Sequence, residues 1–139
     1  MPPSRRRRAA VRAIDTNIVV RFLTGDEPAQ ARKARAVIDA GPFLVLTTVL
    51  LESEWVLRSG YGLGKAEVVE ALIGFSGLPN AMLQEPERVS RALEWAAGGL
   101  DFADALHLAA AADCEALVSF DRKLAKAAKR VGALPVEAP

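Results

Sequence analysis

Two kinds of hydrophobic pattern alternate along the chain. Short, nearly continuous apolar runs predict buried strands, and they occupy residues 11–15, 43–46, 81–83, 116–120 and 134–136. Between them, apolar residues recur at helical spacing, which predicts helices at about residues 16–23, 28–40, 49–59, 65–75, 86–97, 101–114 and 121–130. Strands that alternate with helices form a parallel sheet with helices on both faces. The pattern therefore predicts an α/β fold with three layers, α/β/α, around a central parallel sheet.

Local signals mark the ends of several elements. Gly41-Pro42 and Gly98-Gly99 interrupt helical stretches, as glycine and proline do. Thr47 and Thr48 precede the helix over 49–59, and a threonine hydroxyl is a good N-cap. We expect one folded domain over residues 11–139, preceded at residues 1–10 by a disordered basic arm.

Composition and charge narrow the class of protein. The chain has 139 residues, 51% of them hydrophobic and 25% charged, which suits one globular domain. The net charge is +1, but four consecutive arginines at residues 5–8 contribute to it, and without them the net charge would be −3. The longest apolar run, residues 43–51, is too short to cross a membrane. The single cysteine, Cys114, excludes an intrachain disulfide, so we expect a reducing, cytoplasmic setting. We also expect no export, because an export signal needs an apolar region after the arginines and polar residues interrupt that stretch here.

Carboxylates stand where a ligand site is expected. Ligands of open parallel sheets bind beyond the carboxyl ends of the strands, and Asp15 and Asp121 follow directly after predicted strands. Glu52 lies about one turn into the helix after the second strand. Asp104 lies in the first turn of its helix, three residues after Asp101, and that spacing puts both on one helical face.

Such a set of acids indicates a particular kind of metal. Several carboxylates in one cleft repel one another and destabilise the fold unless a cation compensates. A site of acids without histidine or cysteine favours Mg²⁺, or Mn²⁺, over zinc.

The sequence resembles the PIN-domain family of ribonucleases, and within it the VapC-type toxins. The resemblance rests on AIDTNIVVRFL at residues 13–23, TTVLLESEWVL at 47–57, DFADALHLAAA at 101–111 and SFDRKLAK at 119–126, in the family order. It implies a PIN-like three-layer domain whose acidic metal-binding set is Asp15, Glu52, Asp104 and Asp121. Asn17, Asp101 and Ser119 would be auxiliary residues; many relatives carry threonine where this chain has Ser119.

The resemblance also implies an activity and partners. It predicts an endoribonuclease that uses one or two Mg²⁺ ions to cleave single-stranded or looped RNA, leaving a 5′-phosphate and a 3′-hydroxyl. It further predicts a cognate antitoxin and a homodimer. The helices over 49–59 and 65–75 are candidates for these partner surfaces, because they carry many apolar residues.

Each of these residues also has a structural interpretation. Asp15, Asp101 and Asp121 are suitable helix caps. For Asp101 we expect helix capping to be the main role and metal binding to be secondary. At most one of Glu52 and Glu54 should reach the site, since they face different sides of a helix, and the family position points to Glu52. His107, the lone histidine, is expected to have a packing role rather than a catalytic one, and Trp55 and Trp95 are expected in the core or in an interface.

Two rival functions remain at this point. A haloacid-dehalogenase-like phosphatase also begins with an aspartate after an apolar strand, but its usual second aspartate is Asn17 here. A catalytically silent PIN-like scaffold that binds RNA or a partner is the other rival. A silent scaffold would normally have lost some of its acids, whereas the acidic set of this chain is complete.

Overall fold

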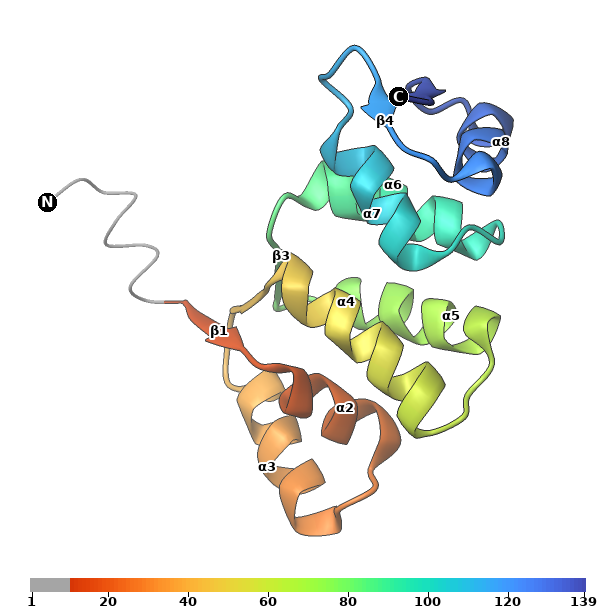
Figure 1. Ribbon diagram of the computed structural model, residues 1–139. Coiled ribbons are helices and arrows are strands. Elements are labelled where there is room, and N and C mark those ends of the chain that lie inside the picture. Colours follow the sequence, from red (N-terminus) through yellow and green to blue (C-terminus); the bar gives the residue numbers. More distant parts are fainter. Residues whose placement is uncertain (1–10) are drawn as a thin grey trace, which may run out of the picture. The chain divides into compact units, whose positions relative to one another are not determined.

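The computed structural model describes residues 11–139 (Figure 1). The expected basic arm at residues 1–10 lies outside the described residues. The chain divides into two compact units, one ending at Glu85 and the other running from Pro86 to Pro139. Each unit is described here by itself.

The first unit is built on a parallel sheet of three short strands. These are β1 (Arg12–Ile14), β2 (Phe43–Val45) and β3 (Ala81–Leu83), hydrogen-bonded in that order and all parallel. Each crossover is helical: α2 (Thr16–Thr24) and α3 (Pro28–Asp39) follow β1, while α4 (Thr47–Trp55), the π-helix η1 (Val56–Gly60) and α5 (Lys65–Ser76) follow β2. Figure 1 shows α2 beside α3 and α4 beside α5. The predicted α/β fold, with a parallel sheet flanked by helices, is confirmed.

Alternate residues of the strands and one face of each helix form the core of this unit. Phe75 is buried in this core, with its ring centroid 5.6 Å from that of Phe22 and 5.7 Å from that of Phe43. Such tilted and edge-to-face arrangements suit the charge distribution of aromatic rings. The other fully buried large side chains of the unit are apolar: Val19, Val45, Leu50, Leu57, Val68, Val69 and Leu72.

The start of α4 differs from the expectation. Neither threonine side chain caps the helix; instead the backbone N–H of Thr47 donates to Oε1 of Gln84 at 3.0 Å. Gln84 is brought there because β3 pairs with β2, which places the residue after β3 beside the residue after β2. The end also differs, because the helix expected to continue to residue 59 changes into the π-helix after Trp55.

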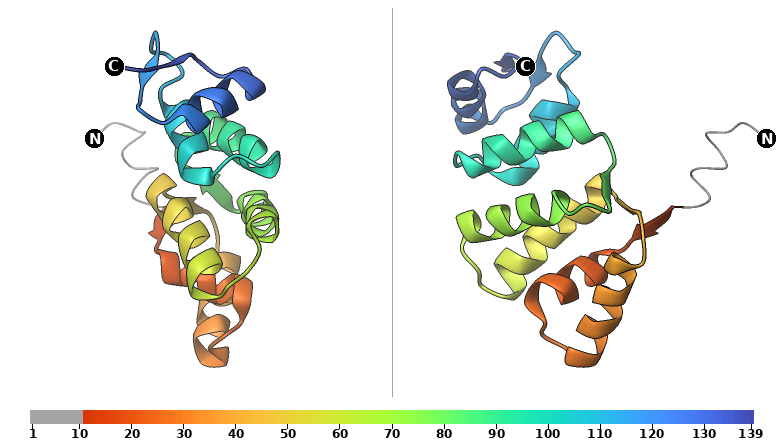
Figure 2. Two further views of the ribbon diagram at one scale, coloured as in Figure 1. Left: turned by 45° about the vertical axis from the view of Figure 1, so that its right-hand side comes forward. Right: turned by 180° about the vertical axis from the view of Figure 1, so that it is seen from behind.

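The second unit contains three helices and a two-stranded parallel ladder. Its elements are α6 (Pro86–Ala97), α7 (Phe102–Ala110), β4 (Leu117–Val118), α8 (Arg122–Val131) and β5 (Val136–Glu137). Helices α6 and α7 lie next to each other in both views of Figure 2, and small buried residues allow this close packing: Ala92, Ala96, Ala105 and Ala109.

Strand β4 is shorter than the expected strand over 116–120. Its last ladder bond is donated by the backbone N–H of Ser119 to the carbonyl of Glu137 at 2.9 Å. After Ser119 the chain leaves the extended conformation of the ladder to begin α8. Within residues 11–139, no helix combines the length and the apolar character needed to cross a membrane.

Candidate active site

A single threonine joins two of the predicted acids in the first unit. The backbone N–H of Thr16 donates to Oδ1 of Asp15 at 2.8 Å, and its hydroxyl Oγ1 donates to Oε1 of Glu52. Thr16 is only 8% exposed, whereas both carboxylates are exposed to solvent. The buried threonine therefore fixes two solvent-facing carboxylates as a pair.

Local sequence explains why this pair forms at the edge of the sheet. Asp15 follows β1 and takes the extended backbone of an N-cap, with φ −91° and ψ 168°, so its side chain reaches the first turn of α2. Glu52 lies in α4, which follows the neighbouring strand β2. The helix cap uses Oδ1 of Asp15, and the hydroxyl of Thr16 bonds to Oε1 of Glu52. Because an ionised carboxylate can accept more than one hydrogen bond, each side chain keeps capacity for a further ligand.

Thr16 was not among the residues predicted for the site. The prediction named Asn17 as the polar auxiliary, and in the structure Asn17 is exposed in the first turn of α2. The available signal was a hydroxyl residue directly after Asp15, at the first position of the helix. That signal alone does not reveal a bond to a residue 36 positions away.

In the second unit Asp101 is a helix cap. Its Oδ2 accepts a hydrogen bond from the backbone N–H of Asp104 at 3.1 Å at the start of α7, as the spacing of the two residues predicted. Asp104 itself is half-buried in the first turn of that helix. His107 is exposed near the other end of α7.

Asp121 is both a cap and a candidate ligand. Its Oδ1 accepts from the backbone N–H groups of Lys123 and Leu124 at 2.9 and 3.1 Å, at the start of α8. Its own N–H donates to Oγ of Ser119 at 3.0 Å. Because both capping bonds use Oδ1, the cap leaves Oδ2 for another role, so capping and metal binding are compatible at this residue.

The neighbouring glutamates of α4 have different surroundings, as predicted. Glu52 is exposed and bonded to Thr16, whereas Glu54 is 2% exposed and paired with Arg58. Nε and Nη2 of Arg58 donate to the two carboxylate oxygens of Glu54 at 2.8 and 3.3 Å. Trp55 is not a core residue, since it is 59% exposed.

The structure brings together part of the predicted set. Asp15 is joined to Glu52 through Thr16 in the first unit, and Asp101 to Asp104 and Ser119 to Asp121 in the second. Within either unit, no three histidine, cysteine, aspartate or glutamate side chains among residues 11–139 form a group that could hold a metal ion. The complete set of four acids therefore stays a prediction.

The Asp15–Glu52 pair fits a hard divalent cation in its chemistry. Both donors are carboxylate oxygens, which Mg²⁺ prefers, and both side chains are exposed to water. Mg²⁺ is commonly bound through one or two carboxylates, with water and substrate phosphate in its remaining positions.

Comparison with known proteins identifies the family of the chain. No curated protein and no solved structure matches the chain. A family model described as PIN domain matches residues 12–130, which cover most of each unit and contain the Asp15–Thr16–Glu52 group and the caps Asp101 and Asp121. Members of this family are generally metal-dependent nucleases. The chain therefore belongs to the PIN-domain family.

Proposed function

We propose that this protein is a Mg²⁺-dependent endoribonuclease that cleaves single-stranded or looped RNA. The observation that carries the proposal is the Asp15–Thr16–Glu52 group at the carboxyl edge of the parallel sheet, in a chain of the PIN-domain family. Unpaired loops are the natural target, since their bases are accessible for recognition. Mn²⁺ is an alternative metal, because it accepts the same oxygen ligands.

In the proposed mechanism the protein holds carboxylates at fixed positions. Asp15 and Glu52, with Asp104 and Asp121, would bind the cation, which would supply an activated water and stabilise charge on the scissile phosphate. Thr16 keeps Asp15 and Glu52 paired, and Ser119 and the start of α8 orient Asp121. The products are a 5′-phosphate and a 3′-hydroxyl.

The test of this activity is cleavage of total RNA by the purified protein with Mg²⁺ or with EDTA. We expect fragments with 5′-phosphates in Mg²⁺ and intact RNA in EDTA. Intact RNA under both conditions contradicts the nuclease and favours a silent scaffold. Cleavage that persists in EDTA contradicts the metal site.

We also propose that the protein is the toxin of a VapBC-type pair, acts in the cytoplasm and forms a homodimer. The exposed side chains of Trp55 on α4 and Ile73 on α5, 59% and 40% exposed, support a partner surface on these helices. Expression alone should inhibit growth, and co-expression with the product of an adjacent small gene should relieve it. Normal growth with active protein contradicts the toxin role and leaves the nuclease intact.

Replacing Thr16 by valine should weaken metal binding and cleavage about 10–100-fold, the usual effect of removing a group that orients a metal ligand. Valine keeps the shape of threonine but cannot donate to Glu52. Titration with Mg²⁺ should show a higher half-maximal concentration, in binding as well as in cleavage. Thr16→Ser, which retains the hydroxyl, should behave like the parent, and an unchanged Thr16→Val variant contradicts a positioning role.

A further inference from the structure

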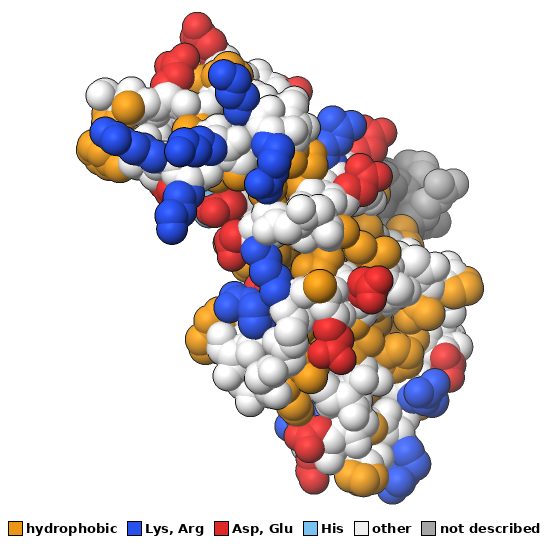
Figure 3. Space-filling model, turned by 90° about the vertical axis from the view of Figure 1, so that its right-hand side faces the viewer, with side chains coloured by type: hydrophobic (Ala, Val, Ile, Leu, Met, Phe, Trp, Pro, Cys, Tyr) orange, Lys and Arg blue, Asp and Glu red, His pale blue; other side chains and the backbone are white. Residues whose placement is uncertain are grey.

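Helix α8 carries an unusual concentration of positive charge on one face. At 100° per residue its five cations fall within about a third of the helix circumference; they are Arg122, Lys123, Lys126, Lys129 and Arg130, all exposed. The opposite face holds the buried Leu124 and Ala128. Figure 3, which faces the side where α8 lies, shows a band of lysine and arginine side chains over this helix. We call these five residues the basic face.

Nothing within the helix neutralises this charge. The segment 122–131 contains no acidic residue. Arg122 and Lys126, and Lys126 and Arg130, are like-charged pairs at i,i+4, a spacing that destabilises a helix. Isolated surface cations usually have no specific role, but five on one face form a continuous positive surface that attracts a polyanion.

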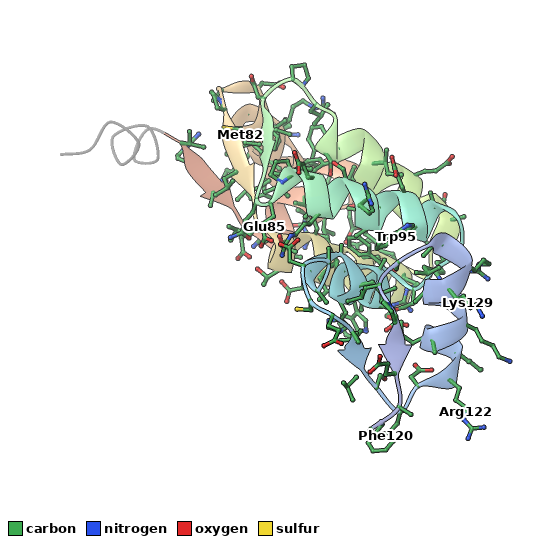
Figure 4. The ribbon with its side chains drawn as sticks, turned by 90° about the horizontal axis from the view of Figure 1, so that it is seen from above. Met82, Glu85, Trp95, Phe120, Arg122 and Lys129 are labelled. Carbon is green, nitrogen blue, oxygen red and sulfur yellow. The ribbon has the colours of Figure 1, made fainter. Side chains whose placement is uncertain are left out.

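An exposed aromatic ring adjoins the start of this face. Phe120 is 87% exposed, the most exposed of the large hydrophobic side chains in the described part of the chain. It lies between Ser119 and Asp121, directly before α8. Figure 4 shows Phe120 projecting away from the ribbon near Arg122, with Lys129 further along the helix. An exposed ring beside clustered cations is the combination that binds single-stranded nucleic acid, because the ring stacks on a base while the cations contact phosphates.

We propose that Phe120 and the basic face of α8 form the binding track for single-stranded RNA. One unpaired base stacks on Phe120, and the phosphates next to it lie along Lys126 and Lys129. The helix is about 15 Å long, so its basic face can contact the phosphates of more than one nucleotide. Since Phe120 directly precedes Asp121, the stacked nucleotide lies next to one of the proposed metal ligands. This inference rests on the proposed ribonuclease function and adds how the substrate is held.

Binding to a single-stranded oligoadenylate that contains one 2-aminopurine, measured in EDTA, tests the track without cleavage. Phe120→Ala should weaken binding roughly 10-fold, within the range for loss of one stacked base. It should also reduce the quenching of 2-aminopurine fluorescence that accompanies binding. Phe120→Trp should restore both. Circular dichroism of each variant checks that the fold is retained.

The basic face is tested through the salt dependence of binding. The double variant Lys126→Gln/Lys129→Gln should lower the slope of log affinity against log salt by about 1.4, since each phosphate contact on a single strand contributes about 0.7. Arg32→Gln/Lys33→Gln, which removes the same charge from exposed positions on α3, is the matched control and should keep the parent's slope.

Three outcomes overturn the inference. One is unchanged affinity and quenching in Phe120→Ala, and another is an equal loss of slope in the α3 control, which shows that only net charge matters. The third is normal RNA binding by the α8 variant with loss of an acidic protein partner, which assigns the face to that partner. If the parent protein cleaves RNA and the variants give any of these results, the binding track is contradicted and the proposed ribonuclease function stands. If the parent neither binds nor cleaves RNA, both the track and the proposed function are contradicted.

Discussion

Asp15→Asn and Glu52→Gln are each expected to reduce Mg²⁺-dependent RNA cleavage more than about 100-fold. Loss of a group that merely orients a metal ligand costs 10–100-fold, so loss of an anionic ligand should exceed that range. Asp104→Asn and Asp121→Asn are expected to do the same. Each substitution replaces one carboxylate oxygen by an amide nitrogen and hardly changes the volume of the side chain.

The same variants should keep their stability when no metal is present. Asparagine caps a helix about as well as aspartate, which preserves the cap at Asp15, and the amide oxygen of glutamine can still accept from Thr16. Thermal unfolding in EDTA should therefore show melting temperatures at or slightly above that of the parent, since removing a charge reduces repulsion among the acids.

Two control variants separate a ligand from a cap and from a surface charge. Asp101→Asn should retain stability and most activity, because its observed role is to cap α7. Asp39→Asn, at the exposed end of α3, should leave both unchanged. Full cleavage by Asp15→Asn would falsify the metal site. If Asp15→Asn lost activity only because a matching fraction of the protein was unfolded, Asp15 would have only a structural role.

Arg58→Met should lower the free energy of unfolding by about 3 kcal/mol. The Glu54 side chain is 3% exposed, and Arg58 is its ion-pair partner at 2.8 Å. Removing one member of a buried pair leaves an uncompensated charge and costs about 3–5 kcal/mol. The lower end applies here because Arg58 is itself 37% exposed. Urea denaturation at neutral pH measures the change.

A second substitution tests the cause of this loss. In the Arg58→Met background, Glu54→Gln should recover much of the stability, because a neutral amide is easier to bury than a carboxylate. A further decrease contradicts the buried-charge explanation. Arg88→Met is the control, since Arg88 pairs with Asp113, which is 87% exposed, and such surface pairs contribute about 1 kcal/mol or less.

The sequence by itself determined the features that depend on neighbouring residues. The alternation of strands and helices, the exact extent of β3, and the caps Asp101 and Asp121 follow from local hydrophobic period and from side chains that bond the backbone two or three positions away. The ordered motifs also indicated the PIN-domain family, which the family model confirms over residues 12–130.

Only the tertiary structure decided which distant residues meet. Thr16 bonds Glu52 across 36 positions, and Gln84 caps α4 across 37, in place of the threonines at the helix start. Parallel pairing of β2 with β1 and β3 places these groups side by side. A local pattern carries no information on such pairing, because a long-range hydrogen bond depends on the register of strands that are far apart in sequence.

Packing likewise distinguished residues that look alike in the sequence. Glu52 and Glu54 are two positions apart on one helix, so they point to different sides, but only the packed structure shows that Glu54 is buried with Arg58 and Glu52 faces solvent. Trp55 and Phe120 are apolar yet exposed, because the surface around each is not covered by another element of the described chain. Hydrophobicity predicts a preference for burial, and the neighbours that the fold supplies determine whether burial occurs.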